Sequence, residues 1–157
     1  MRSINILIVE DESPKRQHLV AAVESFDPRF TVTECASVTG ALNELYSNGV
    51  DFIVLDMSLP TFTIDEDESG GRPQGFGGIE VLRHLLLEES EVPTIVVTGF
   101  EAFERGGRSV ELELLKGELI EEFGDFLVDV LHFSSALDDW KNRLGAHLKK
   151  ISGEIIS

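Results

Sequence analysis

The sequence predicts an α/β fold in which a five-stranded parallel sheet is doubly wound, with helices on both faces. Short apolar, β-branched runs alternate five times with longer segments whose apolar residues recur at helical spacing, which is the pattern of successive βα units. Three of the runs end on Glu10-Asp11, Asp56 and Thr98. The carboxyl ends of such strands meet at one edge of the sheet, where sites form. The 157 residues fit a single domain.

The first βα unit begins almost at the amino terminus. Residues 4–9 are apolar and mostly β-branched, as in a strand buried on both faces. Ser13-Pro14 then provides an N-cap and a proline at the first helical position. The helix runs to about residue 26, and its inward face is expected to carry Leu19, Val23 and Phe26.

The second unit and the third strand follow directly. Residues 30–35 alternate as a strand, and Ser37 can cap a helix that ends at Asn48-Gly49. Residues 52–55 form the third strand, which delivers the carboxylate at position 56. The helix between Ser37 and Asn48-Gly49 is expected to carry Ala41, Leu42, Leu45 and Tyr46 as its apolar residues.

The second half of the chain predicts the remaining units. A helix that starts near residue 78 is expected to bury Ile79, Leu82, Leu85 and Leu86. Residues 93–98 form the fourth strand, Ser109 caps a helix to about Phe123, and residues 126–133 form the fifth strand. The last helix spans about 135–151, with Leu137, Trp140, Leu144 and Leu148 at helical spacing.

Residues 61–77 are expected to form an inserted flexible loop, because they are rich in acidic residues and glycine and have low structural propensity. Asp65, Asp67 and Ser69 resemble the opening of an EF-hand loop. Phe76 stands where that motif requires a bidentate glutamate, however. A flexible acidic loop is the better interpretation.

The composition restricts the partners. The formal net charge is −16, from 29 acidic and 13 basic residues, which disfavours nucleic acid and anionic membrane surfaces. Cys35 is the single cysteine, so an intramolecular disulfide is impossible. The sequence shows no signal peptide and no apolar segment of membrane-spanning length. We therefore expect a cytoplasmic protein.

The acidic strand ends predict a metal-assisted phosphoryl site. Glu10, Asp11 and Asp56 would repel one another unless a cation lies among them, and Mg²⁺ favours a few carboxylates, a carbonyl and water. An aspartate in that setting can act as a nucleophile toward phosphorus. Thr98 supplies a hydroxyl at the neighbouring strand end.

At these residues the sequence resembles the receiver domain of bacterial two-component response regulators. The matching motifs are ILIVEDE at 6–12, DFIVLDMSLP at 51–60 and PTIVVTG at 93–99, and GGIEVL at 77–82 is similar to the start of the third helix of the family. Three motifs in the right order and spacing cover nearly the whole chain. The resemblance implies a flavodoxin-like (βα)5 fold.

The resemblance also implies roles for the site residues. Asp56 would be the phosphoacceptor, and Asp11 and Asp56 would ligate Mg²⁺ together with the main-chain carbonyl of Ser58. Glu10 would hold a metal-bound water molecule. Thr98 would be the switch hydroxyl, moving toward the phosphoryl group.

The sequence departs from the family on the fifth strand, where the usual lysine-proline pair is absent. Asp129 takes the lysine position at the simplest register, and His132 takes it after a slip. A loop cation could substitute, and the candidates are Arg72, Arg105 and Arg108. Without such a cation, phosphoryl transfer should be slower or activation should be coupled differently.

Three further features concern the output. Phe126 matches a switch aromatic that the family often carries on the fifth strand. The loop at 61–77 is longer than the usual connection and could serve as a lid or partner surface. No output domain follows the last helix, which favours signalling by protein contact.

The sequence therefore predicts a single receiver domain in a phosphorelay, and not an enzyme. A histidine kinase or phosphotransfer protein would phosphorylate Asp56, and an unknown output protein would read the result. The last helix could also present its apolar stripe to a second copy and form a homodimer. One alternative is a phosphorylation-independent pseudo-receiver that acts as a binding module. A small phosphatase-like hydrolase ranks last, because neither a second acid/base carboxylate nor a cap is evident.

Overall fold

The computed structural model of this chain describes residues 3–47, 49–57, 77–99, 102–105, 108–134 and 138–156, with the backbone alone at 102–105, 108–112 and 154–156. The strands are β1 (Ile4–Val9), β2 (Phe30–Cys35), β3 (Phe52–Leu55), β4 (Thr94–Thr98), β5 (Ala102–Arg105), β6 (Arg108–Glu111) and β7 (Leu127–His132). The helices are α1 (Ser13–Phe26), α2 (Val38–Ser47), α3 (Gly77–Leu87), α4 (Leu112–Phe123) and α5 (Asp139–Ile156).

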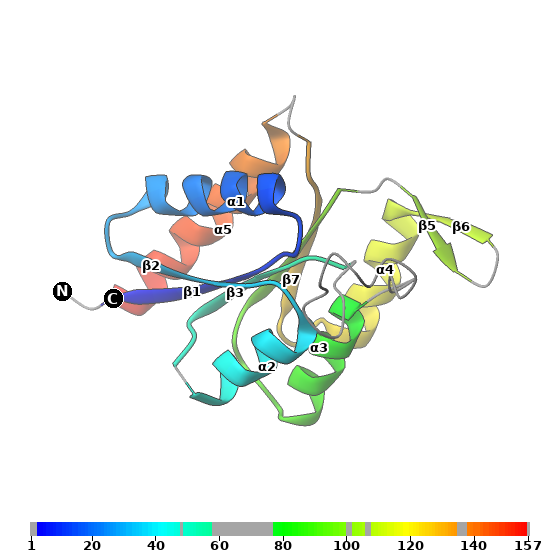
Figure 1. Ribbon diagram of the computed structural model, residues 1–157, viewed down its shortest axis with the longest axis horizontal. Coiled ribbons are helices and arrows are strands. Elements are labelled where there is room, and N and C mark those ends of the chain that lie inside the picture. The colour runs from blue at the N-terminus through cyan, green and yellow to red at the C-terminus, as the bar shows by residue number, and fades with distance from the viewer. Residues whose placement is uncertain are drawn as a thin grey trace, which may run out of the picture.

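The predicted doubly wound parallel sheet is confirmed. Five strands lie in the order β2-β1-β3-β4-β7, and every neighbouring pair is parallel. Helices α1 and α5 cover one face of the sheet, and α2, α3 and α4 lie on the other (Figure 1). The strand order reverses beside β1, which is where α/β sheets of this kind place their sites.

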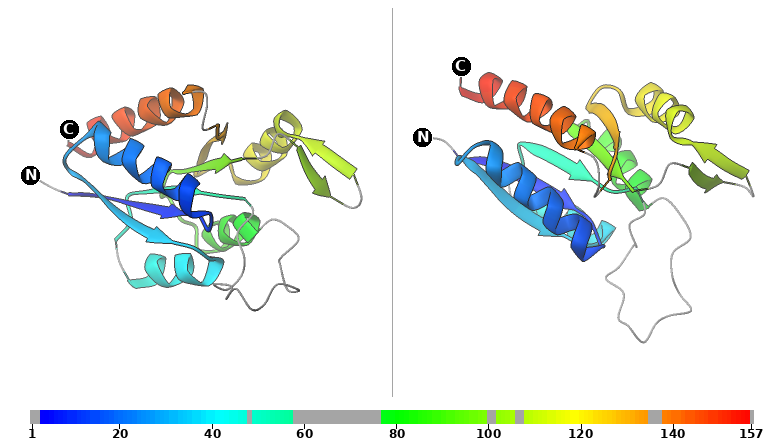
Figure 2. Two further views of the ribbon diagram at one scale, coloured as in Figure 1. Left: turned by 45° about the horizontal axis from the view of Figure 1, so that its top comes forward. Right: turned by 90° about the horizontal axis from the view of Figure 1, so that it is seen from above.

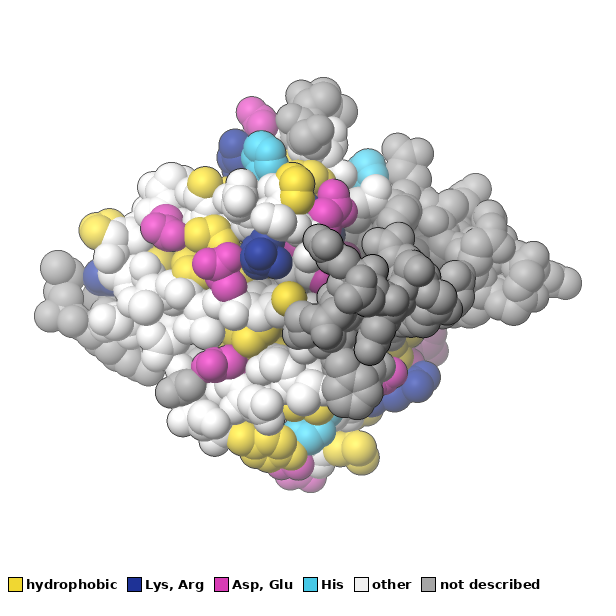
Figure 3. Space-filling view, viewed as in Figure 1, with side chains coloured by type: hydrophobic (Ala, Val, Ile, Leu, Met, Phe, Trp, Pro, Cys, Tyr) yellow, Lys and Arg dark blue, Asp and Glu magenta, His cyan; other side chains and the backbone are white. Residues whose placement is uncertain are grey.

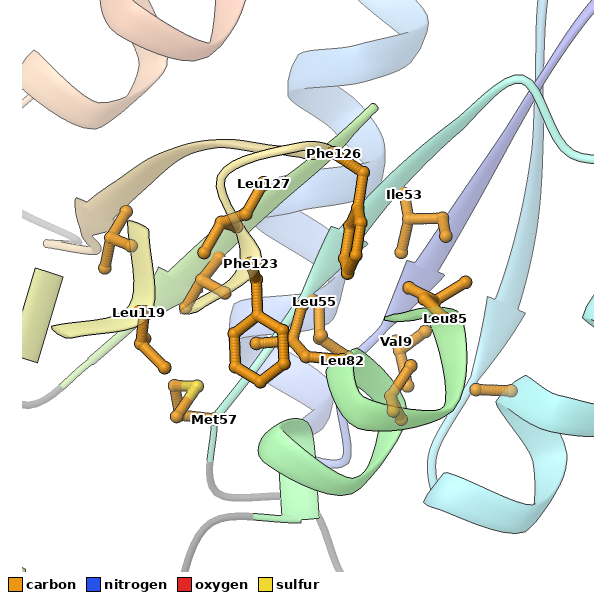
Figure 4. Close-up of a cluster of buried hydrophobic side chains, with 14 of the residues drawn as sticks. Val9, Ile53, Leu55, Met57, Leu82, Leu85, Leu119, Phe123, Phe126 and Leu127 are labelled. Atoms are coloured by element: carbon orange, nitrogen blue, oxygen red, sulfur yellow. The ribbon is translucent and has the colours of Figure 1, made fainter. Parts of the chain in front are cut away.

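Each face of the sheet buries its own apolar cluster. On the side of α1 and α5, Leu19, Val23 and Leu144 pack against strand residues with at most 1% of their surface exposed. Trp140 belongs to the same cluster, as predicted. On the other side, α3 and α4 pack against β3 and β1, with Phe123 among the fully buried side chains (Figure 4). The two clusters fix the strand ends that carry the acidic residues.

Three helix residues predicted to face inward lie at the margin of the core instead. Phe26, Tyr46 and Leu86 are 44%, 67% and 38% exposed, and each lies in the last turn of its helix. Tyr46 packs edge-on against His84 at a ring-centroid distance of 5.3 Å. Hydrophobic side chains gather over α2 and α3 on the face shown in Figure 3.

The segment after β4 differs from the prediction. Strands β5 and β6 form an antiparallel hairpin in which Phe103 pairs with Val110, and the hairpin projects away from the main sheet (Figure 2). Ser109 therefore belongs to a strand, and α4 begins at Leu112 without it. The predicted helix cap at Ser109 is wrong because strand pairing takes up that stretch of backbone.

The helix starts otherwise follow the sequence closely. The hydroxyl of Ser37 accepts a bond from the amide of Gly40 at 3.0 Å, as a cap should. Helix α1 begins at Ser13 with Glu12 as its N-cap, one residue earlier than predicted. The predicted loop falls outside the described residues except for Gly77, which begins α3. None of the described helices is long and apolar enough to cross a membrane.

Candidate functional site

The predicted acidic residues converge at the carboxyl edge of the sheet. Glu10 and Asp11 follow β1, Asp56 follows β3, and Thr98 ends β4. The amide of Asp56 donates to the carbonyl of Val9 at 2.9 Å, which ties the first two strand ends together. One carboxylate oxygen from each of the three acidic residues lies within 4.8 Å of the others. The structure thus brings together the three carboxylates that the sequence singled out.

Burial and mutual repulsion disfavour charge in this cluster. Glu10 and Asp56 are 1% and 4% exposed, whereas Asp11 is exposed. Burial, reinforced by the charge of Asp56, raises the pKa of Glu10 to about 7, although Lys15 acts in the opposite direction. Burial, followed by the charge of Asp56, also raises the pKa of Asp11. A bound cation would relieve both effects.

Lys15 is a member of the site that the sequence prediction missed. Its ammonium lies 2.6 Å from Oε1 of Glu10 and 2.9 Å from Oδ1 of Asp56. It also donates to the carbonyl oxygen of Val97 at 2.8 Å. The sequence contained a signal for this position, because Lys15 stands four residues before Leu19 and so lies on the buried stripe of α1.

The arrangement of oxygens fits a hard cation such as Mg²⁺. Glu10 Oε1 is buried and has no hydrogen-bond partner among the described residues, although Lys15 lies within ionic contact. The other oxygen of Glu10 accepts a bond from the amide of Glu12 at 3.0 Å. Carboxylate oxygens grouped at this spacing are the ligands that Mg²⁺ prefers. Ser58, the predicted carbonyl ligand, lies outside the described residues.

Thr98 and Gly78 complete the described surroundings. Thr98 is fully buried at the end of β4. The amide of Gly78 donates to the carbonyl of Met57 at 3.0 Å, so α3 begins against the backbone that carries Asp56. A Cβ atom on Gly78 would lie 2.4 Å from the carbonyl oxygen of Asp56. Glycine is therefore required sterically where α3 approaches the site.

The register of β7 decides which residue stands at the end of the last strand. An irregularity between Thr94 and Ile95 pairs them with Leu127 and Asp129, and Thr98 then pairs with His132. Such a bulge shifts the alternation of the strand by one residue. The simple register that would place Asp129 at the site is therefore wrong, and His132 is the residue beside Thr98.

Phe126, the predicted switch aromatic, does not lie near the acidic cluster. Phe126 precedes β7 and its carbonyl accepts a bond from the amide of Thr94, so it lies at the amino edge of the sheet, away from the acidic cluster. Its predicted role as a switch aromatic at the site is wrong.

The predicted substitute cations cannot be placed at the site: Arg72 and the side chains of Arg105 and Arg108 lie outside the described part of the chain.

Asp129 forms a separate cluster between β7, α4 and α5. It is 6% exposed, and both of its oxygens accept bonds from Arg143 at 2.9 Å. His147 lies 2.9 Å from Oδ2, and Lys116 lies 3.0 Å from Oδ1. Burial alone would raise the pKa of Asp129, but the bonds from His147, Lys116 and the amide of Val130 outweigh it and lower the pKa. This carboxylate links the two helices electrostatically.

The fold and the acidic cluster define an α/β domain with a polar site at the reversal of its strand order, and comparison with known proteins identifies its class. A family profile described as the response regulator receiver domain matches residues 6–114. The chain belongs to this family. Receiver domains are signalling modules of two-component systems, so the chain is the receiver domain of a response regulator.

Similar proteins match along most of the chain. The uncharacterized protein y4jR of Sinorhizobium fredii is 31% identical over 140 residues, which cover 88% of this chain and 92% of that protein. The Detocs response regulatory protein DtcB of Enterobacter cloacae is 27% identical over 151 residues, which cover 95% of this chain and 99% of that protein.

Solved receiver domains share the fold at low sequence identity. The receiver domain of the Francisella response regulator 1452 gives a TM-score of 0.65 at 17% identity, covering 98% of this chain and 99% of that one. The response regulator TrrA of Thermotoga maritima, solved in complex with Mg²⁺ and BeF, gives 0.62 at 17% identity, covering 94% and 98%.

Proposed function

We propose that this receiver domain accepts a phosphoryl group on Asp56 in a Mg²⁺-dependent reaction. The observation that carries the proposal is the convergence of Glu10, Asp11 and Asp56 within 4.8 Å at the carboxyl edge of the sheet. Asp11 and Asp56 would hold the metal with the main-chain carbonyl of Ser58, and Glu10 would hold a metal-bound water molecule. The complex of TrrA with Mg²⁺ and BeF supports this assignment by analogy.

The reaction is a displacement at phosphorus. A carboxylate oxygen of Asp56 attacks the phosphorus of the donor and forms an acyl phosphate, while the bond between phosphorus and the leaving group breaks. The leaving group departs with the electron pair. Bound Mg²⁺ would neutralise negative charge on the phosphoryl oxygens. Thr98, buried at the neighbouring strand end, is the hydroxyl that would move toward the new phosphoryl group and act as the switch.

Phosphorylation would be read by another protein. The donor is a histidine kinase or a phosphotransfer protein, and the output is a contact with an unknown protein across α4, β7 and α5. The cluster around Asp129 supports this surface, because it joins Lys116 of α4 to Arg143 and His147 of α5. Two arrangements of these helices would provide the two states of the switch. A homodimer through α5 is a second form of output.

The proposal is tested with a small phosphodonor. Wild-type protein is incubated with Mg²⁺ and acetyl phosphate, and the intact mass is compared with that of Asp56→Asn. We expect a phosphate-sized, acid-labile adduct on the wild type and none on the variant, because the amide cannot form the acyl phosphate. Asp138→Asn is the matched control, since the side chain of Asp138 is 75% exposed and the residue lies just before α5. An adduct that persists in Asp56→Asn contradicts the site assignment.

One observation favours the alternative of a phosphorylation-independent binding module. Lys15 already lies in ionic contact with Glu10 and Asp56, so the cluster can be neutralised in part without a metal. In that case no adduct should form, whether or not the pocket holds a metal. The absence of both an adduct and Mg²⁺ binding by calorimetry therefore favours the binding module, whereas an adduct favours the phosphoacceptor.

A further inference from the structure

Lys15 occupies an unusual position for a lysine. It lies in the first turn of α1 and is only 4% exposed. A positive charge near a helix amino terminus is opposed by the helix dipole, and a buried ammonium is costly unless it is paired. The carboxylates of Glu10 and Asp56 and the carbonyl of Val97 supply that pairing. The site itself therefore holds this side chain in place.

The end of β7 lacks the cation that the family usually carries there. His132 pairs with Thr98, and the next residue is Phe133, whose amide donates to the carbonyl of Thr98 at 2.7 Å. The ring centroid of Phe133 lies 5.9 Å from the ammonium of Lys15. An aromatic ring thus stands at the strand end and faces the lysine, at the outer range of a cation–π contact.

We propose that Lys15, delivered by α1, is the cation that neutralises the phosphoryl group on Asp56, in place of a lysine at the end of the last strand. The inference rests on the phosphoacceptor function proposed above. When the oxygen of Asp56 displaces the leaving group from phosphorus, negative charge develops beside an ammonium already 2.9 Å from Oδ1. Lys15 keeps its proton throughout and contributes charge only. Such preorganised charge lowers the barrier to transfer.

Phosphorylation of Asp56 should also move the side chain of Lys15, which gives a second, testable consequence. The new phosphoryl oxygens would compete with Glu10 for the ammonium, so phosphorylation would shift Lys15 relative to the ring of Phe133. Trp140 is the single tryptophan of the chain, and its ring lies 5.1 Å from that of Phe133. Its fluorescence is therefore a local reporter of the movement.

The experiment compares wild type with Lys15→Met at saturating Mg²⁺ and acetyl phosphate. We expect the variant to incorporate the phosphoryl group about a hundredfold more slowly, as when one charge-stabilising donor is removed. Its Mg²⁺ affinity, measured by calorimetry, should be retained or rise, because a competing cation has gone. The fluorescence change of Trp140 on phosphorylation should be lost. Lys150→Met, which makes the same change of charge at an exposed lysine of α5, should behave as wild type.

A second variant guards against a fold defect. Lys15→Met/Phe133→Lys returns an ammonium to the strand end that the family uses. We expect it to incorporate the phosphoryl group at least tenfold faster than Lys15→Met. Incorporation by Lys15→Met at the wild-type rate overturns the inference while leaving the phosphoacceptor function intact. A slow Lys15→Met that the second substitution fails to rescue assigns Lys15 a structural role and also overturns it. A wild type that takes up no phosphoryl group refutes both proposals.

Discussion

At the residue scale, Asp129 lies away from the acidic site for which the sequence offers it. The simplest register offers it for the acidic site, but Asp129 pairs with Ile95, before the strand end at which Thr98 pairs with His132, and its carboxylate lies between α4 and α5. There it is 6% exposed and is bonded by Arg143, His147 and Lys116. Since its partners are themselves partly exposed, they can be hydrated if the carboxylate is removed. The cost of removal is then close to that of a single charged hydrogen bond.

We predict that Asp129→Asn lowers the free energy of unfolding by about 2 kcal/mol at neutral pH. The pKa of Asp129 is lowered from 3.8 in the folded protein, so its charge stabilises the fold above that pH. The contribution is lost as the pH falls through the lowered pKa. Urea unfolding at pH 7 and at steps below pH 4 should show the gap between wild type and variant closing in acid. A gap that stays constant with pH would mean that the charge of Asp129 is not what stabilises the fold.

The same scale shows what the sequence could and could not predict about the site. Glu10, Asp11 and Asp56 were predictable because a strand end fixes its side chains at the edge of the sheet whatever the partners are. Lys15 was not, because its contact with the carboxylates depends on where α1 crosses that edge, which the sequence pattern does not specify. The stripe position four residues before Leu19 indicated burial, but the chemistry of a lysine argued against it.

At the scale of elements, local pattern predicted the five parallel strands and failed at the hairpin. Buried parallel strands are continuous apolar runs and need no partner to be recognised. Strands β5 and β6 are short and lie outside the main sheet, so their stability comes from pairing with each other. Gly106-Gly107 between them is a hairpin signal in the sequence, whereas the helix that follows Ser109 favours a cap at that residue.

The contact between α3 and β3 gives a prediction for this scale. Gly78→Ala should lower the free energy of unfolding by about 2 kcal/mol, because the new Cβ would lie 2.4 Å from the backbone carbonyl oxygen of Asp56 and must displace α3. Helix propensity acts in the opposite direction, by about 1 kcal/mol. Gly117→Ala on α4 is the matched control, since nothing lies within 4 Å of its Cβ position.

Chemical denaturation of the two variants should therefore give opposite signs. Gly117→Ala should be more stable than wild type and Gly78→Ala less stable. Gly78→Ala should also weaken Mg²⁺ binding, because the displaced backbone carries Asp56. Equal stabilisation by both substitutions would show that α3 does not press on the end of β3.

At the scale of the whole molecule, the net charge of −16 acts against the compact state. Self-repulsion of this size is screened by any salt. The acidic cluster adds local repulsion, which is visible in the raised pKa values of Glu10 and Asp11. A bound divalent cation relieves this local repulsion, whereas a general ion atmosphere mainly relieves the repulsion due to the net charge of the whole chain. The two contributions can be separated by matching ionic strength.

We predict that Mg²⁺ at tenfold its dissociation constant stabilises the wild type by about 1.4 kcal/mol, which is about 4 °C in Tm for a chain of this length. NaCl at equal ionic strength should raise the stability only by the amount that screening of the net charge provides. Asp11→Asn is the decisive variant, because Asp11 is exposed and can lose its charge without opening the core. It should keep the response to NaCl and lose the extra rise with Mg²⁺. An extra rise that survives in Asp11→Asn would place the ion elsewhere on this acidic surface, whereas its loss would tie the stability of the whole domain to the metal at the strand ends.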